Sequence, residues 1–120
     1  MSLVSFKYNF KNIIKGDTFK GSQFTVTNNT LAVPVNLTGA SIKMQLKKQG
    51  STTSTALLEL STANGLINIT DAVNGVFEIN PFIMNIPAGS YNYDMQFIFS
   101  GNVIQTYIYG TWTVTEDVTS

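Results

Sequence analysis

Residues 91–99 read Tyr-Asn-Tyr-Asp-Met-Gln-Phe-Ile-Phe, and this stretch decides the fold. Apolar or aromatic residues occupy the odd positions, and three of the four even positions are polar. A β-strand points successive side chains to opposite faces, so a period of two predicts a strand with one buried and one wet face.

The same alternation recurs along the chain. In residues 41–48, Ile42, Met44 and Leu46 alternate with polar residues. Residues 52–60 contain the only plausible helical turn, but their Ser and Thr content favours a strand there. Strands are therefore expected at Ile13–Lys15, Phe19–Thr27, Ala40–Lys48, Ala56–Leu60, Leu66–Thr70, Val76–Asn80, Tyr91–Ser100, Val103–Tyr109 and Thr111–Thr115.

Turn residues separate these short strands at regular intervals, among them the pairs Asn64-Gly65 and Asn74-Gly75, which suit type I′ hairpin turns. Short strands with such spacing are typical of a sandwich or barrel. The sequence thus predicts an all-β, immunoglobulin-like, two-sheet antiparallel sandwich of about seven to nine strands. We expect one domain over residues 1–120, with flexible ends at 1–5 and 116–120 and a mobile loop at Gly50–Thr55.

The composition argues against several functions. The formal net charge is zero, only 12% of residues are charged, and all seven basic residues are Lys. Nucleic-acid binding needs a basic stripe, and Lys43, Lys47 and Lys48 are too few to form one. Without Cys there is no disulfide and no thiolate for zinc. No apolar run is long enough for a signal peptide or a membrane span, so we expect a soluble protein without membrane insertion.

Catalytic residues are scarce. The absence of His and Cys removes the usual nucleophile–base pairs, and no Ser-x-x-Lys sequence occurs. The seven carboxylates have no metal-ligand spacing, and residues 71–75 read more simply as a turn than as a calcium loop. We therefore expect no enzymatic activity, no catalytic or metal residues and no cofactor.

One segment, Val103–Tyr109, is apolar on both of its expected faces. Ile104 and Ile108 alternate with Val103, Tyr107 and Tyr109. A strand that is apolar on both sides is covered by a partner or by a second layer, and a 120-residue sandwich has little with which to cover its outside. Val103, Tyr107 and Tyr109 are therefore predicted to mark an interaction surface, and a homo-oligomer is expected.

The aromatic residues allow a second interpretation. Carbohydrate-binding modules present Trp or Tyr in an exposed row, whereas here Trp112 is in phase with Val114 and so belongs to the core. A carbohydrate- or host-surface-binding module remains the alternative function, with a glycan as a less favoured partner.

Three patches carry a resemblance to a known family. They are residues 15–19 (KGDTF) followed by 24–26 (FTV), residues 34–46 (PVNLTGASIKMQL), and residues 87–97 (PAGSYNYDMQF) closing with 110–114 (GTWTV) and 117–119 (DVT). This pattern resembles small phage and prophage β-sandwich structural proteins, including the immunoglobulin-like domain of phage baseplate upper proteins. The resemblance implies a structural or adaptor role in a tail, baseplate or head accessory. It also implies other virion proteins as partners and a virion location after synthesis in the bacterial cytoplasm. It transfers no catalytic residue.

Overall fold

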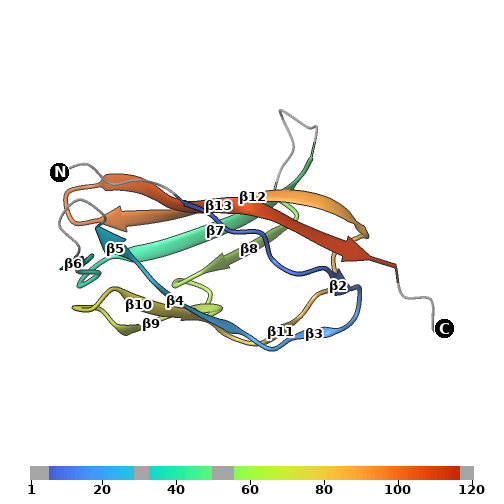
Figure 1. The fold of residues 1–120 in the computed structure, drawn as a ribbon, viewed down its shortest axis with the longest axis horizontal. Coiled ribbons are helices and arrows are strands. Elements are labelled where there is room, and N and C mark those ends of the chain that lie inside the picture. The colour runs from blue at the N-terminus through green and yellow to red at the C-terminus, as the bar shows by residue number, and fades with distance from the viewer. Residues whose placement is uncertain (1–5, 29–32, 50–55, 117–120) are drawn as a thin grey trace.

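The computed structural model describes residues 6–28, 33–49 and 56–116, apart from the side chains of residues 6, 28 and 107. These residues form an all-β structure without any helix (Figure 1). The described residues form thirteen strands, of which seven have four or more residues, against the seven to nine strands expected. The strands are β1 (Phe6–Lys7), β2 (Ile13–Ile14), β3 (Thr18–Phe19), β4 (Ser22–Thr25), β5 (Thr27–Asn28), β6 (Val33–Pro34), β7 (Ser41–Lys48), β8 (Leu58–Ser61), β9 (Ile67–Asp71), β10 (Val76–Ile79), β11 (Phe82–Ile83), β12 (Gly89–Phe99) and β13 (Val103–Thr115).

The main sheet has six strands in the order β1-β13-β12-β7-β8, with β2 also paired to β13. It curls like half a barrel. The β12–β13, β12–β7 and β7–β8 pairs are antiparallel, whereas β1 and β2 run parallel to β13. The expectation of a purely antiparallel structure was therefore wrong at this edge. The N-terminal segment follows β13 in the same direction before it crosses to the other layer.

The remaining strands form smaller antiparallel sheets, β4-β10-β9, β3-β11 and β5-β6. Figure 1 shows β4, β9 and β10 as a second layer facing the main sheet. The alternating residues of both layers meet between them, as a period of two requires when one face is buried. Phe77 of β10 contacts Phe97 of β12 across the layers, with ring centroids 5.5 Å apart.

The core confirms the predicted inward positions. Phe97 is fully buried and Trp112 is 1% exposed. Each fully buried apolar side chain of this size stabilises the fold by about 1.5–3 kcal/mol. Leu37, in the connection that precedes β7, is also fully buried and closes one end of the core. Other buried members are Phe24, Val26, Ile42, Met44, Leu46, Leu60, Ile67, Phe77, Ile79, Met84, Met95, Ile108 and Val114.

Strand boundaries differ from the prediction in three places. The predicted strands Val103–Tyr109 and Thr111–Thr115 form one strand, because Gly110 continues the ladder. The predicted strand Phe19–Thr27 is divided into short pieces, and Gly21 in its first gap has a φ of +94°. Strands β1, β6 and β11 were not predicted, since two-residue strands carry no readable alternation. The predicted loop at 50–55 and the predicted flexible ends at 1–5 and 116–120 lie outside the described residues, apart from residue 116.

Candidate interaction surface

The strand predicted to form a contact, β13, carries an irregularity at Tyr107. On one side of it Met95 pairs with Ile108, and on the other Gln96 pairs with Thr106. Tyr107 therefore has no partner on β12, which is the arrangement of a β-bulge. One extra residue reverses the alternation of inward and outward side chains beyond it.

The bulge corrects the predicted grouping of side chains. Val103 pairs with Phe99, on the face that β12 turns toward the core, whereas Tyr109 pairs with Asp94 on the outer face. Directly paired residues share a face of the sheet, so Val103 and Tyr109 lie on opposite faces. Their assignment to one face was wrong, because the sequence gives no sign of the bulge. The side chain of Tyr107 is outside those described.

The hairpin that joins β12 to β13 is nevertheless apolar on both faces. Ile104 pairs with Ile98 on the outer face, next to Val103 on the inner face. Val103 is 49% exposed and Ile104 is 57% exposed. Pairs of apolar residues this exposed are candidates for contact with another molecule.

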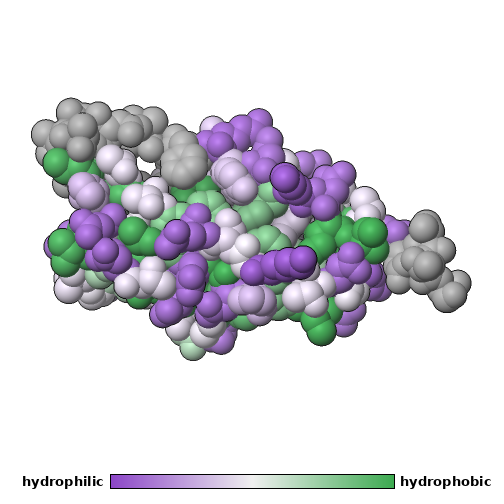
Figure 2. Space-filling view, turned by 60° about the horizontal axis from the view of Figure 1, so that its bottom comes forward, coloured by the Kyte–Doolittle hydropathy of each residue, from purple (hydrophilic) through white to green (hydrophobic). Residues whose placement is uncertain are grey.

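Two more exposed apolar residues lie at the same end of the molecule. Val33 belongs to β6 and Val73 to the turn between β9 and β10, and Figure 1 shows both elements at the end where β12 turns into β13. We call Val33, Val73, Val103 and Ile104 the hairpin-end surface. Figure 2 shows that, on the face it displays, apolar side chains are interspersed with polar ones rather than gathered in one patch.

Tyr109 lies in a different environment, on the outer face of the main sheet. A groove of about 280 Å³ is present on this face, next to Asp94. Sequence reasoning treated these polar positions as a solvated face and missed the groove, although the polar half of the alternation already assigned most of them to one side. The groove is lined by Gln45, Lys47, Lys48, Asn92, Tyr93, Asp94 and Gln96.

Two buried tyrosines hold the chain together by their hydroxyl groups. The Tyr93 hydroxyl donates to the Tyr8 carbonyl at 2.6 Å, which ties β12 to the N-terminal segment. The Tyr91 hydroxyl donates to the carbonyl of Pro87, four residues upstream. Burial raises the pKa of Tyr91. The pKa of Tyr93 is raised mainly by burial and also by the nearby Tyr8. Both hydroxyls therefore remain protonated donors at neutral pH, with a structural role.

The acidic and aromatic residues considered for chemistry are placed elsewhere. Among the described residues, no three His, Cys, Asp or Glu side chains lie close enough to hold a metal ion. Asp71 accepts a hydrogen bond from the Asn74 side chain at 2.8 Å within the predicted turn. Trp112 stacks on Phe10 in the core, with ring centroids 4.1 Å apart. The described part of the chain also contains no helix with the length and hydropathy to span a membrane.

The surface therefore has two distinct regions, an apolar one at the hairpin end and a polar one on the outer face of the main sheet. Neither brings Val103 and Tyr109 together. Comparison with known proteins adds no family to this description: no protein-family model matches the chain, and no curated protein matches its sequence.

Proposed function

We propose that this protein is a non-enzymatic structural or adaptor component of a bacteriophage particle, and that it acts through protein–protein contacts of an immunoglobulin-like sandwich. Its partners are other virion proteins or further copies of the same chain. It is made in the bacterial cytoplasm and resides in the virion, in the tail, the baseplate or a head accessory.

The strand order supports the immunoglobulin-like part of the proposal. The neighbours β13-β12-β7-β8 follow the G-F-C-C′ order of a variable-type sheet, and β4-β10-β9 follow the B-E-D order of the facing sheet. The hydrogen bond from Tyr91 to Pro87 is the contact of a tyrosine corner, which stands at the start of strand F in such domains.

The residues that carry the phage resemblance occupy structural positions in this fold. Residues 15–19 turn the chain from β2 into β3, and residues 34–46 lead from β6 through the buried Leu37 into β7. Residues 87–97 contain the tyrosine corner and most of β12. The shared pattern thus follows the turns and core of the domain, which supports a common architecture.

The observation that carries the contact role is the exposure of Val103 and Ile104 on the two faces of one hairpin. An exposed hairpin with apolar residues on both sides can insert between two partner surfaces, which suits a part that links neighbours in an assembly. The near-zero net charge adds little electrostatic repulsion to oppose such association.

Two measurements test the proposal. Mass spectrometry of purified particles from a bacterium that carries the gene should find this chain in constant proportion to the major particle proteins. Its absence from the particles would contradict the virion role.

The contact role is tested by light scattering of the purified protein, alone and with candidate particle proteins. The double variant Val103→Asp, Ile104→Asp should reduce association, whereas Ile83→Asp, an exposed position in β11 away from the hairpin, should not. If both variants associate to the same extent, the hairpin-end surface is not part of the interface.

A further inference from the structure

We infer that the outer face of the main sheet binds an acidic saccharide, a sugar chain carrying carboxylate or phosphate groups. The inference goes beyond the structural role proposed above and does not depend on it. It rests on the groove of about 280 Å³ and on the side chains that the sheet register places around it.

The register sets polar side chains next to one another across the sheet. Asn92 pairs with Lys47, and Asp94 pairs with Gln45, all on the outer face. The Gln45 amide donates to the Glu59 carboxylate at 2.9 Å, and the Asn92 side-chain oxygen accepts from the Gln49 amide at 3.1 Å, which fixes the orientation of both amides. Their remaining donors and acceptors are then at fixed spacing, as vicinal sugar hydroxyls require. Among the described residues, no side chain or backbone group hydrogen-bonds to the side chains of Lys47 and Asp94.

An exposed aromatic ring flanks this polar row. Tyr109 of β13 is the cross-strand partner of Asp94 and is 44% exposed. Side chains directly opposite on a sheet lie about 5 Å apart, within reach of one bound sugar unit. A tyrosine ring presents a flat face on which the C–H side of a sugar can pack while its hydroxyls bond to the polar row.

The charges around the groove favour an anionic ligand. Lys7 pairs with Tyr109, Lys43 lies on the outer face opposite Gln96, and Lys47 and Lys48 line the groove. Three of these ammonium groups, those of Lys7, Lys43 and Lys47, lie on the outer face, whereas Lys48 pairs with the inward-facing Tyr91. The same face carries two carboxylates, those of Asp94 and Glu59. The carboxylate in the centre of the row and the absence of Arg make a nucleic acid a poorer fit than a sugar with spaced acidic groups.

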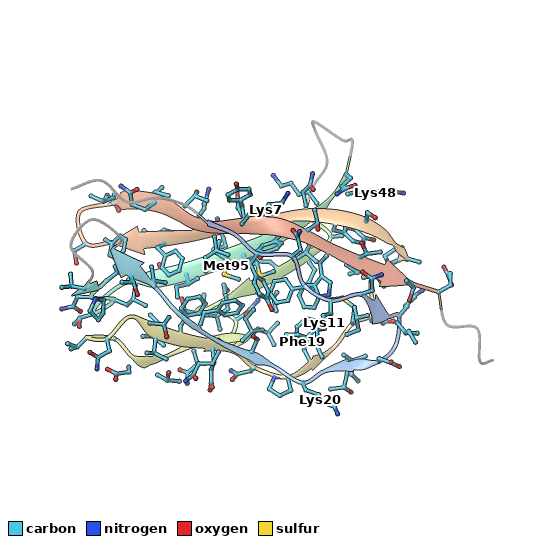
Figure 3. All side chains as sticks on the ribbon, in the orientation of Figure 1. Lys7, Lys11, Phe19, Lys20, Lys48 and Met95 are labelled. Atoms are coloured by element: carbon cyan, nitrogen blue, oxygen red, sulfur yellow. The ribbon has the colours of Figure 1, made fainter. Side chains whose placement is uncertain are left out.

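The other layer supplies a matched control. A groove of about 300 Å³ lies there between Lys20 and Glu78, lined by Gly21, Ser22, Gln23, Ile79, Asn80 and Pro81. It contains polar groups and one ammonium but no aromatic side chain. Figure 3 shows Lys20 and Lys48 on opposite sides of the molecule, so ligand binding at one groove can be measured separately from binding at the other.

The test is a titration of the isotope-labelled protein with tetragalacturonate, followed by backbone amide chemical shifts. Shifts are expected at residues 45–48, 92–96 and 109 and not at residues 20–23. Lys47→Gln and Tyr109→Ala should each weaken binding about tenfold, the loss of roughly one charge-assisted contact or one stacking contact. Lys20→Gln should bind like the wild type, and Tyr109→Phe should retain most of the affinity because stacking needs the ring and not the hydroxyl.

Three further probes decide the ligand class. The methyl-esterified tetrasaccharide, which lacks the charges, should bind about tenfold or more weakly. Inorganic phosphate and an eight-residue oligothymidylate should bind more weakly than tetragalacturonate. The inference is overturned if tetragalacturonate shifts no outer-face amide, if the neutral ester, phosphate or oligonucleotide binds equally well, or if Lys20→Gln weakens binding as much as Lys47→Gln. All these substitutions are at exposed or half-exposed positions, and circular dichroism of each variant checks that it folds.

Discussion

Gly110 is the residue on which the N-terminal edge of the main sheet depends. A Cβ atom at this position would lie 1.9 Å from the carbonyl oxygen of Tyr8. The same carbonyl accepts the hydroxyl of Tyr93, the residue opposite Gly110 on β12. The missing side chain thus lets the first segment of the chain approach β13 closely enough for the Tyr93 hydroxyl to reach it.

Gly110→Ala is expected to lower the free energy of unfolding by about 2 kcal/mol, because overpacking a close contact forces the backbone to shift. Urea denaturation measures the change. Thr113→Ala, a half-buried position on the outer face of the same strand, serves as the control and should cost less than about 0.5 kcal/mol. Equal stability of Gly110→Ala and the wild type would show that the edge segment adapts freely.

Tyr93 makes stability depend on alkaline pH. Its pKa is raised in the folded protein, whereas in the unfolded chain the hydroxyl titrates near pH 10. Below that pH both states are protonated, and the group contributes no pH dependence. As the pH rises further, the unfolded state releases its proton first, so the free energy of unfolding is expected to fall.

Tyr93→Phe should reduce this alkaline fall while lowering stability at neutral pH by about 1 kcal/mol, the net value of a typical hydrogen bond. Denaturant titrations between pH 7 and about pH 11 measure both effects. Burial also raises the pKa of Tyr91, so this residue contributes in the same direction. The free energy of unfolding of the double variant Tyr93→Phe, Tyr91→Phe should therefore fall least as the pH rises. If the free energy of unfolding of Tyr93→Phe falls with pH as steeply as that of the wild type, other groups cause the pH dependence.

At the scale of elements, residues 8–10, between the short strands β1 and β2, pack as part of the core. Phe10 stacks on Trp112 and makes an edge contact with Tyr93 at 5.2 Å. The Asn9 side-chain oxygen accepts hydrogen bonds from the backbone nitrogen and hydroxyl of Thr111, both at 3.1 Å. Side-chain contacts thus continue the attachment between the short strands β1 and β2.

Phe10→Ala is expected to destabilise the protein by about 3–5 kcal/mol, the usual cost of removing a buried aromatic ring. Ile83→Ala is the matched control, since Ile83 is 63% exposed, and should change stability little. Thermal or urea denaturation compares the two variants. A small effect of Phe10→Ala would mean that the segment contributes little to the stability of the sheet.

At the scale of the whole molecule, the two layers share one core. Aromatic contacts run without interruption from Phe24 to Phe77 in the smaller sheet and on to Phe97 in the main sheet. The molecule is elongated, with extents of 49 × 29 × 24 Å, yet this core joins both layers. Neither layer retains a buried face without the other.

Unfolding is therefore expected to be a single cooperative transition. The fluorescence of Trp112, the only tryptophan, reports on the packing between layers, and far-ultraviolet circular dichroism reports on all strands. The two signals should give the same urea midpoint. Two separate midpoints would show that one layer survives the loss of the other.

The sequence by itself determined the long strands and their buried faces. The alternation in β7 and β12 predicted both, because burial of one sheet face demands a period of two over several residues. Short strands such as β1 and β11 escaped prediction, since two residues show no period. The pairs Asn64-Gly65 and Asn74-Gly75 suggested type I′ turns, but only the glycine of each pair has positive φ, whereas Gly101 and Asn102 both do.

Only the tertiary structure decided how those faces are used. The bulge at Tyr107 separates Val103 from Tyr109, and the parallel N-terminal edge depends on contact between Gly110 and Tyr8. The groove around Asp94 likewise joins residues of two strands far apart in the chain. Alternation is a local property that each strand carries alone. Register, bulges and grooves arise between strands, and no single segment encodes its partner's position.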